Sequence, residues 1–362
     1  MFPLVCAEQA PLLSPSLIQM HQIRISNLAP STFCPATKVQ GRAGGEVLIL
    51  KNMLLNIILL ITGVAVVLWG ADRLTEGAVG LAERMGVSQL VIGLTIVALG
   101  TSMPEFCVSL VSAIKGTSDL AVGNVVGSNI FNSMLIVGCS AMVAPMTILK
   151  STVRKDIPFA LIASIVLYMM VVDGDEANIT RVEAAVLVVM LLVFMFITFR
   201  SAKDVPDADI EERHYMNPWK AVSFLLLGLV CLIVGSNVFV DNATAIAKSL
   251  GVSDAVIGLT IVAGGTSLPE LATSIVAARK GNSGIAIGNV LGSNVFNILF
   301  ILGVTGVIAP MQIHGITSLD LSMMIISMIL LWLFSYTKLT IERWEGAVLA
   351  LLFVGYMGWL IY

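Results

Sequence analysis

An internal repeat constrains this chain more than any other feature of its sequence. Residues 86–138 align with residues 251–303 at an offset of 165 and without gaps, and 33 of the 53 positions are identical. GVSQLVIGLTIVALGTSMPE in the first copy matches GVSDAVIGLTIVAGGTSLPE in the second, and AVGNVVGSNIFN matches AIGNVLGSNVFN. A chain that carries two such copies is predicted to fold as two related halves.

The composition places both halves in a membrane. Hydrophobic residues make up 57% of the 362 residues and charged residues only 12%, about half the ~25% of an ordinary soluble domain. Apolar stretches recur from residue 53 onward, many of them close to the ~20 residues that cross a bilayer as a helix. We predict an all-α polytopic membrane protein whose ten transmembrane helices lie near residues 53–70, 88–114, 119–144, 156–172, 181–199, 218–240, 253–278, 284–309, 317–336 and 344–361.

Each copy of the repeat lies within a unit of five predicted helices. Because five is odd, the second unit must enter the membrane inverted relative to the first, an arrangement typical of secondary transporters with a substrate site between the copies. We predict a first five-helix repeat over residues 53–200, a short cytoplasmic connector over 201–217 and a second five-helix repeat over 218–362. Residues 1–52 contain five prolines, and we expect a disordered N-terminal tail or a segment upstream of the true start codon.

The distribution of basic residues orients this predicted topology. With both termini outside, the cytoplasmic connections carry 13 of the 20 lysines and arginines and the outer connections carry 3, the other 4 lying in the expected tail. Basic residues concentrate on the cytoplasmic side of membrane proteins. We therefore predict that the N-terminus and the C-terminus are both outside.

The motifs GTSMPE and GTSLPE place a helix breaker and a carboxylate inside apolar segments. Pro104 and Pro269 lack an N–H group, so each removes one hydrogen bond from its helix. Non-helical backbone at membrane depth is tolerated only where it lines a protein-enclosed cavity. Glu105 and Glu270 are the acidic residues deep within these predicted helices, and an intramembrane carboxylate usually marks a functional site. The sequence therefore predicts broken helices around a central site.

The residues around these glutamates supply oxygen atoms at helical spacing. Hydroxyl and amide side chains recur three or four residues apart, and such oxygens suit hard cations such as Ca²⁺ and Na⁺. Ser102 and Glu105 also fit a capping box that restarts a helix, and the threonine hydroxyls can bond back to their own helix. Because both copies carry the same set, we favour a cation site built from Thr101, Ser102, Glu105, Ser128, Asn132, Thr266, Ser267, Glu270, Ser293 and Asn297.

The paired GTS[ML]PE and GSN[IV]FN motifs resemble the two repeats of sodium/calcium exchangers in the calcium/cation antiporter superfamily, small prokaryotic type. The resemblance implies that Glu105 and Glu270 are the central cation ligands, assisted by the hydroxyl and amide groups named above and by the backbone carbonyls of Ala98 and Ala263. Some members of the family that the chain resembles, notably potassium-dependent ones, carry aspartate at the position of Asn297. The neutral side chain here therefore favours potassium-independent transport.

We predict a secondary antiporter that exchanges Na⁺ for Ca²⁺ by alternating access in a bacterial inner membrane, and that is electrogenic. The alternatives that the sequence leaves open are a proton/calcium or other divalent-cation antiporter and a passive cation channel. An intramembrane enzyme is disfavoured because no predicted helix core holds a histidine base or a pair of aspartates. We expect no cofactor beyond the transported ions, no nucleic acid and no obligate protein partner; the surroundings are the lipid bilayer.

Overall fold

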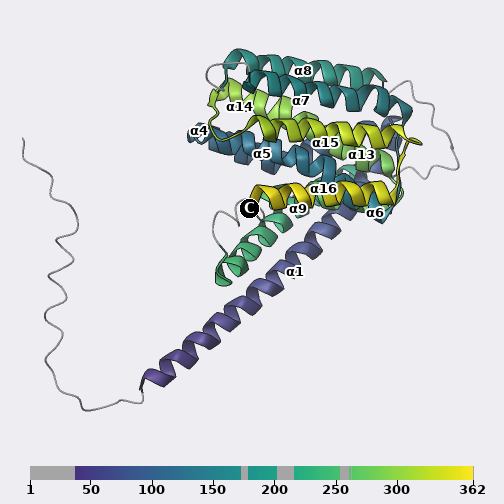
Figure 1. Ribbon diagram of the computed structural model, residues 1–362. Coiled ribbons are helices and arrows are strands. Elements are labelled where there is room, and N and C mark those ends of the chain that lie inside the picture. The colour runs from purple at the N-terminus through teal and green to yellow at the C-terminus, as the bar shows by residue number, and fades with distance from the viewer. Residues whose placement is uncertain (1–36, 173–177, 202–215, 253–260, 262, 362) are drawn as a thin grey trace, which may run out of the picture. The chain divides into compact units, whose positions relative to one another are not determined.

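The computed structural model describes residues 37–172, 178–201, 216–252, 261 and 263–361, which are almost entirely helical (Figure 1). The chain divides into residues 1–51 and residues 52–362, and all packing described below lies within the second unit. The first helix, α1 (Thr37–Met85), begins two residues after the last of the five N-terminal prolines, Pro35. Residues 37–52 are thus helical, and residues 1–36 lie outside the described part; the expected disordered tail over 1–52 stays a prediction.

The first half of the chain continues from α1 through a series of shorter helical segments. Several are turns of π-helix, labelled η, that interrupt longer α-helices. The elements are α2 (Gln89–Ile92), η2 (Gly93–Val97), α3 (Ala98–Thr101), α4 (Met103–Ile114), α5 (Ser118–Ile130), η3 (Phe131–Ile136), α6 (Val137–Val143), β1 (Met146–Thr147), η4 (Thr152–Asp156), α7 (Ile157–Val172), β2 (Asn178–Ile179) and α8 (Arg181–Ser201).

The described part of the second half repeats this order, except that no π-helical turn equivalent to η4 precedes α15. Residues 253–260 and 262 of the predicted helix over 253–278 lie outside the described part. The elements are α9 (Pro218–Ser249), α11 (Ala263–Thr266), α12 (Leu268–Arg279), α13 (Ser283–Val295), η6 (Phe296–Leu302), α14 (Gly303–Ile308), β3 (Met311–Gln312), α15 (Ser318–Tyr336), β4 (Thr340–Ile341) and α16 (Arg343–Ile361).

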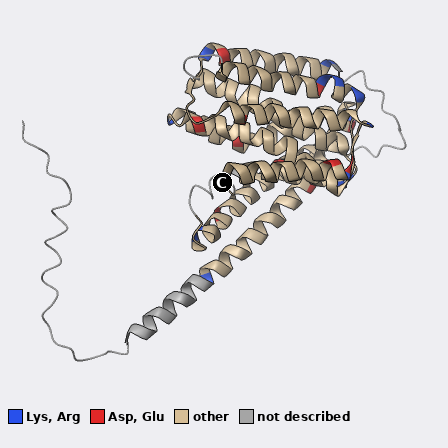
Figure 2. Cartoon of the chain, in the orientation of Figure 1, with Lys and Arg blue, Asp and Glu red and all other residues tan. Residues whose placement is uncertain are grey.

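The long helices have the length and composition of membrane-spanning segments. Among the described residues, 7 helices are long and apolar enough to cross a bilayer, and 8 if the bent pair Gln89–Thr101 and Met103–Ile114 counts as one span. Charged side chains gather near helix ends, whereas the long faces between them are free of charge (Figure 2). Large apolar side chains stand exposed on these faces, for example Val182 at 75% and Leu351 at 69%. Such surfaces are stable in lipid, and the chain is an integral membrane protein.

Local signals in the sequence explain where several helices begin and end. The Asn217 side chain accepts a hydrogen bond from the Trp219 N–H and starts α9, and Thr317 forms a capping box with Asp320 at the start of α15. Gly116 and Gly281 occupy equivalent positions in the two copies and have φ angles of +77° and +79°. Only glycine adopts this conformation without strain, so both tight turns after α4 and α12 depend on it.

Two short β-ribbons each join the first half to the second. Strand β1 pairs antiparallel with β4, with Met146 opposite Ile341, and β2 pairs antiparallel with β3, with Asn178 opposite Gln312. Strands β1 and β3 occupy equivalent positions in the two copies. The helical segment α5–η3–α6 starts at Ser118 beside β3 and ends at Val143 just before β1. The two ribbons therefore lie at opposite ends of this segment.

Helices α1 and α9 pack antiparallel through glycines. A Cβ atom on Gly70 would lie 2.9 Å from the Gly228 carbonyl oxygen, and one on Gly63 would lie 3.0 Å from the Gly235 carbonyl oxygen. Gly63 is equivalent to Gly228 and Gly70 to Gly235 at the repeat offset of 165. The contact therefore joins equivalent surfaces of the two halves, and the missing side chains let the two backbones approach closely.

Helix α15 lies beside both α7 and α5 (Figure 1), and α5 packs against α4, which carries the first glutamate motif. Helix α13 packs against α2, η2 and α3 of the other half, and α5 packs against η6. The core thus interleaves the two copies instead of keeping them apart. This interleaving brings the motif residues of one copy next to those of the other.

Candidate functional site

Both glutamate motifs break their helices at the serine before the proline. Ser102 has φ −83° and ψ 7°, and the equivalent Ser267 has φ −90° and ψ 8°. In the first copy the helical pieces on either side of the break are bent by 47°. Neither serine side chain caps the helix that follows it, so the structure excludes the capping-box interpretation.

The two serine hydroxyls bond instead to the glutamate of the opposite copy. Ser102 Oγ donates to Glu270 Oε1 at 3.0 Å, and Ser267 Oγ donates to Glu105 Oε1 at 3.0 Å. Both glutamates are 1% exposed. The two bonds are related by the repeat offset, so they form a symmetric clasp between α4 and α12 at the centre of the protein.

Each clasped carboxylate keeps one oxygen without a protein partner. Neither Glu105 Oε2 nor Glu270 Oε2, both buried, has a hydrogen-bond partner in the structure. Other buried oxygens of the predicted set share this property, namely Asn132 Oδ1, Asn297 Oδ1 and Ser293 Oγ. A buried polar atom without a partner is destabilising by about 1–3 kcal/mol. The region therefore offers a set of oxygens that a bound cation would satisfy.

The asparagines of the predicted set begin unusual stretches of helix. Asn132 is the second residue of η3 and Asn297 is the second residue of η6, and both are 1% exposed. Segment η3 packs against α12, which carries Glu270, and η6 packs against α4, which carries Glu105. Short π-helical turns inside α-helices are frequent at functional sites. Each amide thus lies next to the helix that bears the glutamate of the opposite copy.

The hydroxyl groups of the predicted set fall into different environments. Ser128 Oγ lies 3.2 Å from Ser267 Oγ. Because the single Ser267 proton goes to Glu105, Ser128 is the donor in this pair and extends the Glu105 side of the clasp. Thr101 Oγ1 contacts the Ala98 carbonyl oxygen at 3.4 Å and donates to Asn289 Oδ1 at 3.1 Å. The proposed back-bonding of Thr101 is therefore present together with a contact to the other copy.

The remaining predicted residues lie at the expected breaks. Thr266 is the last residue of α11, directly before Ser267, and Ala263 is the first residue of the same helix. The Ala98 carbonyl also accepts from the Ser102 N–H at 3.0 Å. The structure thus brings Glu105, Ser267 and Ser128 together in one hydrogen-bonded group, and Glu270 with Ser102 in another.

Two asparagines that sequence reasoning left outside the site support the glutamates from behind. Asn289 Nδ2 donates to the Glu270 backbone carbonyl at 3.3 Å and to Ser274 Oγ at 3.0 Å. Asn124 Nδ2 makes the equivalent bonds to the Glu105 carbonyl at 3.3 Å and to Ser109 Oγ at 3.0 Å. Each asparagine lies 19 residues after the glutamate of its own copy. This repeated spacing is the sequence feature that could have placed them beside the site.

The two buried carboxylates of the clasp would be stabilised by a positive charge. Two buried carboxylates lie within one hydrogen-bonded region, and in the described part of the chain no ion pair includes Glu105 or Glu270. Burying an unpaired ion costs several kcal/mol of free energy. No cluster of three or more His, Cys, Asp or Glu side chains occurs among the described residues. The arrangement thus suits cations held by two carboxylates and neutral oxygens.

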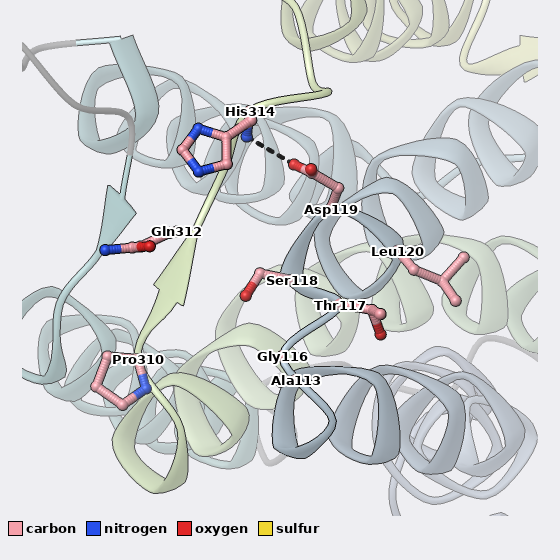
Figure 3. A pocket seen from close by; sticks show the side chains of 9 residues that line it. All are labelled: Ala113, Gly116, Thr117, Ser118, Asp119, Leu120, Pro310, Gln312 and His314. Carbon is pink, nitrogen blue, oxygen red and sulfur yellow. Dashed lines mark hydrogen bonds between the residues drawn. The ribbon is translucent and has the colours of Figure 1, made fainter. Parts of the chain in front are cut away.

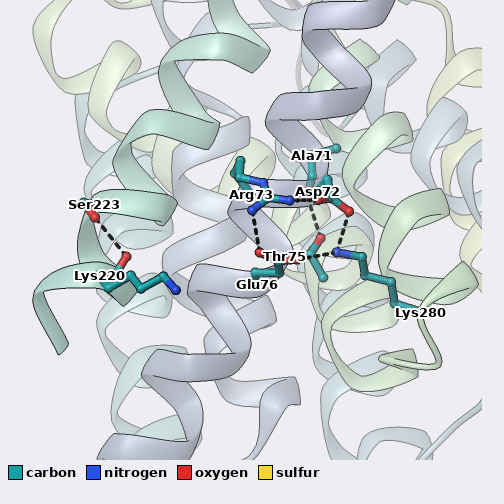
Figure 4. Close-up of polar contacts among 8 residues, drawn as sticks. All are labelled: Ala71, Asp72, Arg73, Thr75, Glu76, Lys220, Ser223 and Lys280. Carbon is teal, nitrogen blue, oxygen red and sulfur yellow. Dashed lines mark hydrogen bonds and ion pairs between the residues drawn. The ribbon is translucent and has the colours of Figure 1, made fainter. Parts of the chain in front are cut away.

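Four charged residues join α1 to the end of α12 at a distance from the clasp (Figure 4). Arg73 pairs with Asp72 and, at 2.9 Å, with Glu76; Lys280 pairs with Asp72 and, at 3.2 Å, with Glu76. The acids are neutralised by the two bases, so the cluster links the helices and leaves no net charge.

A surface pocket of about 670 Å³ lies at the turn between α4 and α5 (Figure 3). Asp119 and His314 both line it. The carboxylate of Asp119 accepts hydrogen bonds from the backbone N–H groups of His314 at 2.7 Å and Gly315 at 2.9 Å. Because this carboxylate holds the loop after β3 in place, the pocket has a structural explanation and is separate from the glutamate clasp.

Comparison with known families decides the relationship of the chain. The family model described as sodium/calcium exchanger protein matches residues 55–200 and 220–362, which correspond to the two halves and make up most of the sequence. The chain belongs to the sodium/calcium exchanger family. The resemblance found in the motifs is thereby confirmed, and the protein is a membrane antiporter and not an enzyme.

Individual relatives align with this chain over nearly their whole length. Sodium/calcium exchanger MaX1 of Methanosarcina acetivorans is 32% identical over 346 residues, 85% of this chain and 99% of MaX1. Inner membrane protein YrbG of Escherichia coli is 38% identical over 293 residues, 79% of this chain and 90% of YrbG. A solved structure of the sodium-calcium exchanger NCX_Mj superposes with a TM-score of 0.74 at 30% identity, covering 84% of this chain and 98% of NCX_Mj.

Proposed function

We propose that this exchanger-family member moves Ca²⁺ across the membrane in exchange for Na⁺ by alternating access. The observation that carries the proposal is the clasp, in which Glu105 and Glu270 are buried, held by serines of the opposite copy, and each left with one oxygen free of protein partners. Calcium and sodium both prefer oxygen ligands. Competition of the two ions for the same oxygens would couple their movements.

The charge of the clasp sets the expected coupling. Two ionised carboxylates are neutralised by one Ca²⁺ or by two Na⁺. A third Na⁺, which the family resemblance implies, leaves one net positive charge per cycle. Such a cycle is electrogenic and responds to voltage by about 2.3 kcal/mol per charge per 100 mV.

We assign the cation ligands to the residues predicted from the two motifs. The five buried side-chain oxygens without partners support this assignment for Glu105, Glu270, Asn132, Asn297 and Ser293. The hydrogen bonds within the clasp support it for Ser102, Ser267 and Ser128. Thr101, Thr266 and the carbonyls of Ala98 and Ala263 complete the proposed set through their positions at the helix breaks.

For the membrane arrangement we propose ten helices in two inverted five-helix repeats, over residues 53–200 and 218–362, joined by a cytoplasmic connector at 201–217. The antiparallel contact between equivalent glycines of α1 and α9 supports inversion. Both termini are placed outside because of the 13-to-3 basic bias. The relative YrbG is an inner membrane protein by name, which supports a bacterial inner membrane. No cofactor, nucleic acid or obligate protein partner enters this proposal.

The deciding experiment is ⁴⁵Ca²⁺ uptake into proteoliposomes loaded with Na⁺, with external Na⁺, K⁺ and pH varied in turn. We expect uptake only when Na⁺ is loaded inside, and inhibition by external Na⁺. Uptake driven by an imposed proton gradient without Na⁺ would replace the proposal with proton coupling. Uptake without any counter-ion would indicate a channel.

A further inference from the structure

The two asparagines proposed as ligands are held differently although their positions are equivalent. Asn132 and Asn297 are both buried, and the Oδ1 atom of each lacks a protein partner. Asn297 Nδ2 donates to Asn129 Oδ1 at 3.3 Å. The equivalent bond in the other copy would join Asn132 to Asn294 Oδ1, and Asn294 Oδ1 has no partner in the structure. Only the Asn297 amide is therefore anchored in this way among the described residues.

The two copies differ in sequence around these amides. Asn294 Nδ2 donates to Ser133 Oγ at 2.8 Å. The residue equivalent to Ser133 in the second copy is Ile298, which has no acceptor. Asn129 Nδ2 donates instead to Met324 Sδ of α15 at 3.7 Å. Because Asn129 Nδ2 is bonded to Met324 Sδ, the Oδ1 atom of Asn129 faces Asn297 and accepts its hydrogen bond.

The direction of this hydrogen bond matters because an amide has two unlike ends. Its oxygen can coordinate a cation, whereas its NH₂ group only donates hydrogen bonds. With Nδ2 of Asn297 bound to Asn129, its Oδ1 is fixed at the other end of the group, where no protein donor meets it. A carboxylate at position 297 would present an oxygen in either orientation and would not need this anchor.

We propose that Asn129 is a positioning residue that orients the Asn297 amide so that its oxygen faces the transported cation. The inference rests on the proposed function, because it assigns Asn129 a role in the same cation site. Both residues are almost fully buried, Asn129 at 2% and Asn297 at 1% exposure, so water does not substitute for the bond. The selective orientation of one ligand amide makes the two halves of the site unequal.

The test measures ⁴⁵Ca²⁺ binding to purified full-length protein in detergent for four variants: Asn129→Leu, Asn297→Asp, the double variant, and Asn294→Leu. Asn129→Leu should raise the Ca²⁺ dissociation constant about tenfold, the size of one hydrogen bond of about 1.4 kcal/mol. In the Asn297→Asp background, Asn129→Leu should shift the Ca²⁺ dissociation constant less than about twofold, because the effects of substitutions at two contacting residues are not additive. A smaller effect of Asn129→Leu when residue 297 is aspartate is expected only if Asn129 acts by orienting the Asn297 amide.

Asn294→Leu is the matched control, since it removes an equivalent buried amide that bonds to Ser133. It should lower the melting temperature to a similar extent and leave the Ca²⁺ dissociation constant within about twofold. An equal loss of affinity in Asn129→Leu and Asn294→Leu would overturn the inference, because general packing would explain both. An equal effect of Asn129→Leu in both backgrounds would overturn it as well.

Met324→Leu provides a milder variant in case Asn129→Leu does not fold. This swap conserves volume and removes the acceptor that holds the Asn129 nitrogen, so a weaker loss of Ca²⁺ affinity is expected, again absent with Asn297→Asp. Unchanged affinity in Met324→Leu and in folded Asn129→Leu would refute the positioning role. If the unmutated protein bound neither Ca²⁺ nor Na⁺, the proposed function itself would fail, and this outcome is distinct from the others.

Discussion

Ser267 in the second copy donates a 3.0 Å hydrogen bond to Glu105 in the first, and the repeat offset turns this bond into the one from Ser102 to Glu270. Each serine stands at the break that its own proline creates, three residues before its own glutamate. The helix break therefore frees a hydroxyl to reach across to the opposite copy. These two hydrogen bonds join the two halves at the site that we propose for cations.

Replacing either acid should stop transport. We expect Glu105→Gln and Glu270→Gln each to abolish Na⁺-driven Ca²⁺ uptake, because each removes half of the fixed negative charge and leaves a buried site with about 3–5 kcal/mol less compensation for the cation. Uptake into proteoliposomes measures the effect, and size-exclusion profiles check the fold. Glu342→Gln, at an acid paired with Lys338 on the surface, is the matched control. Near-normal uptake by either site variant would refute the shared site.

Replacing the clasp serines should weaken binding without destroying it. Ser102→Ala and Ser267→Ala each remove one hydrogen bond to a carboxylate and one proposed ligand oxygen. We expect the half-saturating Ca²⁺ concentration to rise at least about tenfold, because hydrogen bonds to charged groups contribute about 1.5–3 kcal/mol. Initial rates of ⁴⁵Ca²⁺ uptake give this value. A large effect in one variant and none in the other would contradict the symmetric clasp.

The proposed topology predicts which ends of the helices face the cytoplasm. In a variant without native cysteines, a cysteine at Lys338, whose side chain is 77% exposed, should react with an impermeant maleimide only from the cytoplasmic side. A cysteine at the exposed His314, in the loop after β3, should react only from outside. The basic bias is the physical reason. Labelling from the reverse sides would invert the orientation, and labelling of both from one side would rule out the proposed span count.

The glycine contact between α1 and α9 should be intolerant of added side chains. A Cβ atom on Gly228 would lie 2.5 Å from the Leu74 backbone nitrogen, whereas one on Gly355 would meet nothing within 4 Å. We expect Gly228→Ala to destabilise the protein by about 1–3 kcal/mol through overpacking. Gly355→Ala should be neutral or stabilising by up to about 1 kcal/mol. Thermal unfolding in detergent compares the two, and equal melting temperatures would argue against this close contact.

The sequence predicted the membrane class, the family and the residues of the glutamate motifs, because all three depend on local patterns. Broken helices follow from Pro104 and Pro269, whose chemistry acts within one turn. The pairing of Ser102 with Glu270 did not follow, because it depends on how two segments 168 residues apart pack against each other. The π-helical turns at Phe131 and Phe296 had no recognised sequence signal. The bond from Asn297 to Asn129 has no equivalent among the described residues of the other copy, and the high identity of the two copies gave no sign of this difference.

The last prediction concerns potassium and turns on Asn297. An amide oxygen coordinates a cation but brings no charge, whereas the family resemblance implies a carboxylate at this position in some relatives, notably potassium-dependent ones. The site therefore holds two fixed negative charges, from Glu105 and Glu270, and fewer charges favour fewer bound cations. We expect Na⁺-driven Ca²⁺ uptake to be unchanged when K⁺ is replaced by choline on both sides of the vesicle membrane.

The voltage must be clamped in this experiment by a protonophore and not by valinomycin, because an electrogenic cycle responds to any potential that K⁺ removal creates. Asn297→Asp supplies the comparison, since it adds a third acid and should change the apparent affinity for Na⁺ and Ca²⁺. A strict K⁺ requirement in the unmutated protein would show that the neutral amide does not set ion coupling. The role of the clasp in binding Ca²⁺ would stand in that case, because Glu105 and Glu270 would still supply its charge.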